Sequence, residues 1–171
     1  KLGNKWHRMR SINRSISHRL RQWRQWSWGE RWLVLRALLL LPLLTLGVRL
    51  VGYQRVRGCL AWTLPLIPPT VYSCRDASAE IAQAMRIGRL VNGAARGGLL
   101  RANCLSRSLL VWWLLGRQGI VSEVVIGARV EQGEFRAHAW VQCQQRVVND
   151  RPDVAERFHP FAWPARLRRL A

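Results

Sequence analysis

Acidic residues are scarce in this chain. Nine Asp and Glu face 28 Lys and Arg among 171 residues, and the formal net charge is +19. This imbalance argues against basic partners and favours acidic ones, such as nucleic acid, anionic lipid or an acidic peptide. Apolar residues make up 49% of the chain, which is ordinary for a folded domain, so wholesale disorder is excluded as well.

Closely spaced cysteines are also missing. The four cysteines are Cys59, Cys74, Cys104 and Cys143, and no two of them form a CxxC pair. A structural zinc site needs such spacing, and a small disulfide scaffold needs more cysteines in a shorter chain. We therefore expect a reducing, cytoplasmic setting, no metal site and no intrinsic cofactor.

The apolar runs are short. The longest uncharged stretch extends from Ala37 to Val48, whereas a membrane span needs about 20 apolar residues. It follows a long basic segment without a small-residue cleavage site, which argues against a signal peptide. The sequence predicts a helix over 32–52, kinked at Pro42, that is buried against the protein or a partner, or touches a membrane surface.

The first 31 residues combine arginines with four tryptophans. Bases of single-stranded nucleic acid can stack on Trp, but no nucleic-acid-binding motif accompanies the charge. We therefore expect a solvated arm or a basic helix resting on a membrane or partner, and no binding of nucleic acid. Clustered prolines indicate a linker at 63–75. They divide the chain into residues 1–75, the arm with its apolar helix, and residues 76–171, a candidate catalytic domain.

Beyond the linker, helices are followed by strands. Apolar residues recur at helical spacing from an N-cap at Asp76 or Ser78 to about Ala95, and a second helix follows its cap, Asn103. Three β-rich stretches come next, over 121–130, 135–143 and 146–150, with a turn built on Gly133. The sequence therefore predicts an α+β fold, in which a helix that begins with a cysteine packs on a small antiparallel sheet.

This part of the chain contains three residues that could act together as a nucleophile, a base and an orienting carboxylate. Cys104 occupies the first turn of a helix, where unpaired backbone N–H groups favour a thiolate and can donate to an oxyanion. Of the four histidines, His138 alone lies on a predicted core strand, and Asp150 ends the next strand. They predict a triad in which His138 takes the thiol proton, later protonates the leaving amine, and is oriented by Asp150.

The alternation of side chains along a strand gives this triad hypothesis a geometric requirement. A two-residue loop at Gln144–Gln145 would place Ala139 opposite Asp150 and put His138 on the other face of the sheet. The triad is therefore expected to require a three-residue loop or a bulge between Cys143 and Asp150.

Each triad residue also has an ordinary structural explanation. A lone cysteine at a helix start is often a small buried hydrophobe, and a strand-ending aspartate is often a turn residue. Cys143 is expected to be structural. Arginines that flank the site, including Arg136, either bind a carboxylate or phosphate or form solvated surface. The candidate substrate-binding residues are Arg101, Asn103, Arg107 and Trp140.

The segments CLSRSLL, GRQGI, VVIGAR, FRAHAWV and RVVND lie together within residues 101–151. This combination resembles the transglutaminase-like cysteine peptidases of lasso-peptide biosynthesis, the leader peptidases or B proteins of that pathway. The resemblance implies a papain-like, transglutaminase-type core with its Cys-His-Asp triad at Cys104, His138 and Asp150. It also implies removal of the leader from a ribosomally made precursor peptide, through a thioester on Cys104 that water hydrolyses.

The same resemblance implies partners. These are the precursor peptide, a leader-recognition protein and an asparagine-synthetase-like cyclase that uses ATP, so a requirement for ATP would enter through the cyclase. The first 75 residues show no alternating strand pattern, which favours a separate recognition protein over a fused domain. Two alternatives remain open: a transglutaminase-like acyl transferase with the same triad and an amine acceptor, and a non-catalytic basic adaptor for nucleic acid or anionic membrane.

Overall fold

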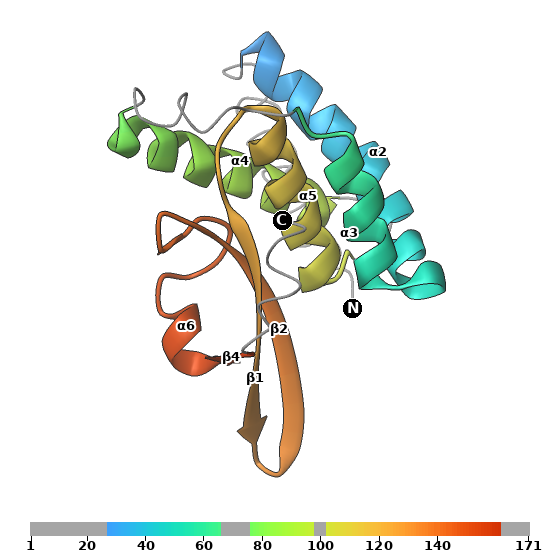
Figure 1. The fold of residues 1–171 in the computed structure, drawn as a ribbon, viewed down its shortest axis with the longest axis vertical. Helices are drawn as coiled ribbons and strands as arrows, with labels where there is room; N and C mark the ends of the chain where they lie inside the picture. The colour runs from blue at the N-terminus through green and yellow to red at the C-terminus, as the bar shows by residue number, and fades with distance from the viewer. Residues whose placement is uncertain (1–26, 66–75, 98–101, 162–171) are drawn as a thin grey trace, which may run out of the picture.

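The computed structural model describes residues 27–65, 76–97 and 102–161. The basic arm before Ser27, most of the expected linker, Arg101 and the basic C-terminal end lie outside these residues. The helices that precede the sheet are α2 (Trp28–Val51), α3 (Tyr53–Trp62), α4 (Ala77–Gly97) and α5 (Cys104–Arg117) (Figure 1). Asp76 caps α4, as expected, because its Oδ1 accepts from the Ser78 backbone N–H at 2.9 Å.

The sheet follows the helices and is antiparallel. Its order is β3-β2-β1-β4, with β1 at Glu123–Glu131, β2 at Glu134–Cys143, β3 at Arg146–Val147 and β4 at His159–Pro160. The short helix α6 (Val154–Arg157) lies between β3 and β4 in the chain. The far end of the β1–β2 hairpin extends away from the helices (Figure 1). This arrangement confirms the expected α+β fold with a papain-like core.

Helix α5 is central to the packing, since it contacts β2 on one side and both α2 and α4 on the other. Leu109, Leu110 and Leu115 on α5 are fully buried. They belong to one hydrophobic core that also contains residues of α2, α3, α4 and the sheet. The boundary expected at residue 75 therefore does not separate two cores within the described part of the chain.

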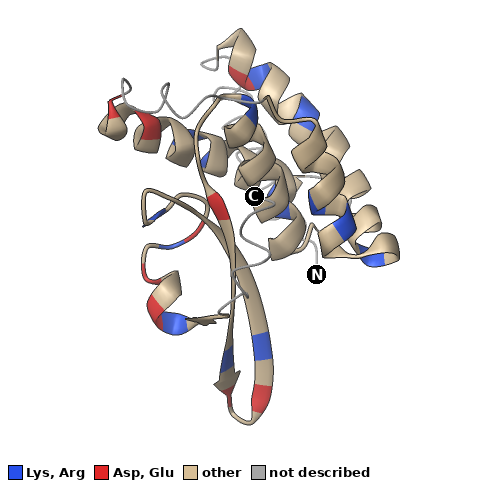
Figure 2. Cartoon of the chain, in the orientation of Figure 1, with Lys and Arg blue, Asp and Glu red and all other residues tan. Residues whose placement is uncertain are grey.

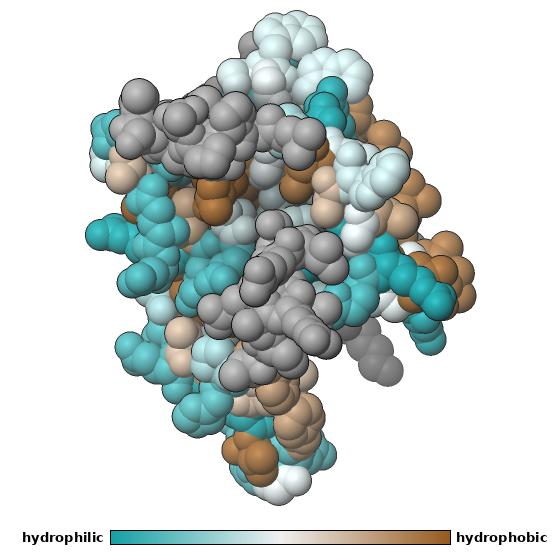
Figure 3. All heavy atoms as spheres, in the orientation of Figure 1, coloured by the Kyte–Doolittle hydropathy of each residue, from teal (hydrophilic) through white to brown (hydrophobic). Residues whose placement is uncertain are grey.

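Helix α2 is continuous through Pro42 and carries apolar residues on two opposite faces. Its N-terminus forms a capping box, in which the Ser27 backbone N–H donates to Glu30 at 2.8 Å. One face is buried at Val34, Ala37, Leu41 and Leu44. The opposite face is an exposed stripe of large hydrophobic residues, spaced by three or four residues: Trp28, Trp32, Leu35, Leu39, Leu43, Leu46 and Leu50. Figure 3 shows brown, hydrophobic surface along the edge of the molecule where α2 lies.

The helix passes the length and composition test for a membrane span, with 22% of its most apolar window buried inside the protein. Core helices of soluble proteins pass the same test, so this result is weak support for a span. It is consistent with a contact at a membrane surface, and equally with a core helix that keeps one apolar face exposed.

Candidate active site

Cys104 is the first residue of α5, and the cap before it fixes its position. The Asn103 Oδ1 accepts from the Ser106 backbone N–H at 2.7 Å, and the Asn103 carbonyl accepts from the Arg107 N–H at 3.2 Å. The apolar side of α5 is buried, so the helix holds this end against β2. Cys104 itself is half-buried, which leaves the thiol reachable from solvent.

His138 lies on β2 and is paired across the ladder with Gly127 of β1. Its ring is packed between two aromatic side chains: the Phe158 ring centroid is 5.0 Å away, and the Trp140 ring is stacked at 6.4 Å. These contacts restrict the rotation of the imidazole.

The hairpin between β2 and β3 differs from the expected one. Cys143 pairs with Arg146, so the loop is the two-residue pair Gln144–Gln145, and both residues have positive φ, 48° and 64°. The expectation of a three-residue loop or a bulge was therefore wrong. Even so, Asp150 reaches His138, because regular pairing ends after Val147 and the chain leaves the ladder.

Asn149 is the reason for this departure. Its Oδ1 accepts from the Val141 backbone N–H at 2.7 Å, at the point where a continuing strand would supply a carbonyl. Its Nδ2 donates to the Ser108 Oγ at 3.0 Å, and that hydroxyl donates to the Ala139 carbonyl, also at 3.0 Å. The buried carboxamide thus ends the sheet, ties it to α5 and redirects the next residue, Asp150.

The result is a chain of three side chains. His138 Nε2 lies 2.7 Å from Asp150 Oδ2, which leaves Nδ1 as the ring nitrogen for the Cys104 thiol, and Cys104 and His138 shift each other's pKa. Asp150 receives a further hydrogen bond from the Arg151 backbone N–H at 2.8 Å. The nucleophile, base and orienter expected from the sequence are therefore neighbours in space.

The surroundings shift the ionisation of all three groups. The bond to Asp150, followed by the bond to Cys104, raises the pKa of His138 to about 9. Burial opposes ionisation of Cys104, but His138, the Ala139 backbone N–H and Arg107 together lower the pKa of the thiol below its ordinary value. Burial likewise opposes ionisation of Asp150, yet its hydrogen bonds to His138 and Arg151 leave its pKa lowered. These directions favour a thiolate beside an imidazolium at neutral pH.

The predicted substrate-binding residues lie in different settings. Asn103 uses its amide oxygen as the helix cap. Arg107 is half-buried and acts electrostatically on both Cys104 and Asp150. Trp140 is fully buried on the same face of β2 as His138, and its ring is stacked against the imidazole, so it supports the imidazole instead of facing a substrate. Arg136 is exposed and lies 3.5 Å from Glu131, away from the triad.

Two supporting residues escaped the sequence analysis. Asn149 and Ser108 are buried polar residues whose mutual hydrogen bond joins segments far apart in the chain. The Asn-Asp pair at the end of the last strand was a signal, since Asn is unusual in strands, but nothing in the sequence indicated its partner. In ranges 27–65, 76–97 and 102–161, no three His, Cys, Asp or Glu residues gather in a group that could hold a metal ion.

A cleft of about 460 Å³ opens beside the triad, lined in part by His138, Asp150 and four arginines. A larger hollow of about 700 Å³ lies between α2 and α4 and includes none of the three triad residues. The smaller cleft therefore lies on the His138 and Asp150 side of the three residues, and Cys104 is not among the residues that line it.

Comparison with known proteins gives one match. The model of the Transglutaminase-like superfamily matches residues 47–162, which is more than half of the chain and includes Cys104, His138 and Asp150. No curated protein and no solved structure matches the chain.

Proposed function

Since the chain belongs to the transglutaminase-like superfamily, typically a family of cysteine-dependent enzymes, we propose that it is a cysteine peptidase. Its substrate would be a ribosomally made lasso precursor peptide, from which it removes the leader. The observation that carries this proposal is the 2.7 Å contact of His138 with Asp150 together with the Cys104 thiol, whose pKa His138 lowers. The substrate class rests on the resemblance of residues 101–151 to leader peptidases.

The first half of the proposed reaction forms a thioester. The Cys104 thiolate attacks the carbonyl carbon of the scissile bond, and the oxygen becomes an oxyanion. The backbone N–H of Cys104, at the first helical position, belongs to the group that a helix leaves unpaired and is a candidate donor to that oxyanion. His138 then protonates the leaving amine, and the C–N bond breaks.

The second half releases the leader. The neutral His138 takes a proton from water, the resulting hydroxide attacks the thioester carbon, and the C–S bond breaks to regenerate the thiolate. Asp150 keeps the imidazole oriented throughout and stabilises its positive form. No step needs a cofactor, so any use of ATP is assigned to the partner cyclase.

Partners would bring the substrate to this site. We assign leader binding to a separate recognition protein, and ring closure to an asparagine-synthetase-like cyclase. The exposed apolar stripe of α2 supports contact with a partner or with a membrane surface in the cytoplasm, because a stripe of this length is costly to leave in water. Binding to nucleic acid is not part of the proposal.

The test is mass spectrometry of lasso precursor peptides incubated with the recognition protein and the enzyme. Wild-type protein should release leader and core, Cys104→Ala should release neither, and the matched control Cys59→Ala, at an exposed cysteine on α3, should cleave normally. Equal cleavage by wild type and Cys104→Ala would contradict the assignment of the nucleophile. Absence of cleavage by folded wild type would favour the adaptor, whose binding to anionic lipid or nucleic acid should depend steeply on salt.

An acyl transferase uses the same thioester, and the family match supports both activities. The two differ in the acceptor: water gives a free carboxylate, whereas an amine gives an isopeptide bond. Adding a primary amine to the same incubation separates them by product mass.

A further inference from the structure

Four arginines line the cleft beside the triad. Two come from α4, one from α5 and one from the loop that follows β3: Arg89, Arg96, Arg107 and Arg151. Figure 2 shows basic residues both on α4 and on that loop. The acidic residue lining the cleft is Asp150, whose carboxylate is already bonded to His138 and to the Arg151 backbone. Arg151 is itself ion-paired with Asp153 at 3.1 Å, so the excess of positive charge on the walls of the cleft comes from Arg89, Arg96 and Arg107.

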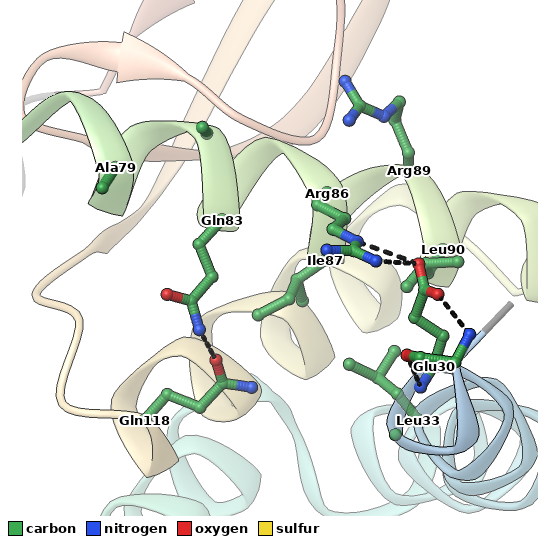
Figure 4. A pocket seen from close by; sticks show the side chains of 12 residues that line it. Glu30, Leu33, Ala79, Gln83, Arg86, Ile87, Arg89, Leu90 and Gln118 are labelled. Carbon is green, nitrogen blue, oxygen red and sulfur yellow. Dashed lines mark hydrogen bonds and ion pairs between the residues drawn. The ribbon is translucent and has the colours of Figure 1, made fainter.

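The two arginines of α4 lack acidic partners within the described ranges. Arg89 and Arg96 lie seven residues apart, so they share one face of the helix with Asn92 between them. By contrast, Arg86, on the next face, is bonded to Glu30 of α2 at 2.8 Å. Figure 4 shows Arg86 directed to Glu30, whereas Arg89, which lines both the α2–α4 hollow and the cleft, is not directed to Glu30. The α4 arginines are thus not explained by ion pairs that hold the fold together.

Arg107 is the most constrained of the four. Its Nη1 donates to the Asn92 Oδ1 at 3.3 Å, and Asn92 in turn donates to the Asn149 carbonyl at 2.6 Å. These bonds fix the guanidinium at the wall of the cleft. Its Nε is buried and has no hydrogen-bond partner among the described residues. The part of Arg107 that can meet a ligand is therefore the outer end of the guanidinium, at the wall of the cleft.

We propose that this cleft is the subsite for an acidic side chain, Asp or Glu, of the peptide substrate. The inference rests on the proposed peptidase activity and adds a specificity to it. A carboxylate fits the donors because guanidinium groups pair with it in bidentate geometry. The cleft adjoins His138, so a peptide whose scissile carbonyl meets Cys104 would place a nearby side chain in the cleft. Arg89 and Arg96 supply attraction, and Arg107 fixes the position of the carboxylate.

The first test needs no turnover. Iodoacetate carries a carboxylate and iodoacetamide is its neutral counterpart, and both alkylate thiolates with loss of iodide. Labelling of Cys104 and of exposed Cys59 is quantified by peptide mass spectrometry, and the iodoacetate-to-iodoacetamide rate ratio is taken at each. In the Arg89→Gln/Arg96→Gln double variant, the ratio at Cys104 should fall about fivefold, as expected for two solvent-exposed charge pairs. The ratio at Cys59 should not change.

Arg86→Gln is the matched control, since it removes the same charge from the same helix on the side of Glu30. It should leave the ratio at Cys104 unchanged. An unchanged ratio in the double variant, or an equal fall in Arg86→Gln, would overturn the proposal, because the charge would then act only through the overall field of the protein.

The second test asks for peptide specificity. A random octapeptide library, blocked at both ends, is incubated with wild type, and the cleaved products are sequenced by mass spectrometry. Asp and Glu should be enriched about fivefold over Asn and Gln at one position near the cut, and the enrichment should vanish in the double variant. Cleavage without this enrichment would reject the acidic subsite and keep the peptidase. No cleavage of the library, with the labelling ratios as expected, would support the carboxylate cleft, and the precursor incubation with the recognition protein would then decide the peptidase activity separately.

Discussion

Gly88 on α4 lies directly against the backbone of Val148. A Cβ at position 88 would collide with the Val148 carbonyl oxygen and come within 2.9 Å of its carbonyl carbon. Val148 is two residues before Asp150, so the distance between α4 and the triad loop is set by the missing side chain. This contact places the segment that carries Asn149 and Asp150.

We therefore expect Gly88→Ala to displace this segment. It should lower the free energy of unfolding by about 1–3 kcal/mol, as overpacking against backbone does, and reduce kcat/KM together with it. Urea unfolding and peptide cleavage measure the two effects. Gly93→Ala on the same helix is the control, because a Cβ there meets nothing within 4 Å, and Ala should stabilise the helix by about 0.5–1 kcal/mol. Equal effects of the two substitutions would contradict the role of Gly88.

The Asn149–Ser108 bond predicts non-additive energetics. Asn149→Ala leaves the buried Val141 N–H without an acceptor, and Ser108→Ala removes the acceptor of Asn149 Nδ2. Each substitution should therefore lower the free energy of unfolding by about 1–3 kcal/mol. In the double variant the costs should fall short of their sum by about 0.5 kcal/mol or more. Denaturant unfolding of the four proteins gives the coupling energy. Strict additivity would show that the bond does not link α5 to the triad loop.

The pH dependence of kcat/KM should report the ion pair between His138 and Asp150. Activity needs a protonated His138 to protonate the leaving amine, so kcat/KM should fall as pH rises through about 9. Asp150→Asn removes the largest cause of the raised pKa, so the alkaline limb should move to lower pH and kcat/KM should drop by about 10²-fold. Cleavage rates from pH 5 to 10 test this. An alkaline limb that stays in place would contradict the assignment of Asp150 as the orienter.

The free energy of unfolding should depend on pH through the same two groups, His138 and Asp150. The folded-state pKa of His138 is raised from 6.5 to about 9, so the stability it contributes is complete below pH 6.5 and is lost as pH rises through about 9. Asp150, whose pKa is lowered from 3.8, contributes stability above that value and loses it on acidification. Thermal unfolding of wild type and Asp150→Asn across this range should converge at both extremes. A constant difference in Tm would contradict the linkage.

The β2–β3 turn offers a stabilising change. Gln145 has φ of 64°, a conformation that costs an L-residue about 1 kcal/mol or more and that glycine adopts freely. Gln145→Gly should therefore raise the free energy of unfolding by up to about 1 kcal/mol, with unchanged cleavage. Gln142→Gly, at the next-to-last residue of β2 where it pairs with both β1 and β3, is the control and should destabilise. A loss of stability at position 145 would show that the turn is not strained.

Local signals predicted the elements that carry the site. Asn103 before an apolar periodic run located the start of α5 and thus Cys104, and alternation located β2 and His138. The approach of Asp150 could not be derived from alternation, because a side chain, that of Asn149, replaces a backbone group of the ladder. Nor could the sequence show that α2 packs into the same core, since its apolar residues cover both its buried and its exposed face.

The groups that lower the pKa of Cys104 have a consequence for the chain before it is folded. Of those named, His138 and the Ala139 N–H belong to β2, and Arg107 is one helical turn away on α5. None of them surrounds the thiol in an extended polypeptide, where it keeps an ordinary pKa. In a newly made or unfolded copy, Cys104 would therefore have only the reactivity of an ordinary cysteine, and its activation would be present only in copies whose helix and sheet have already joined.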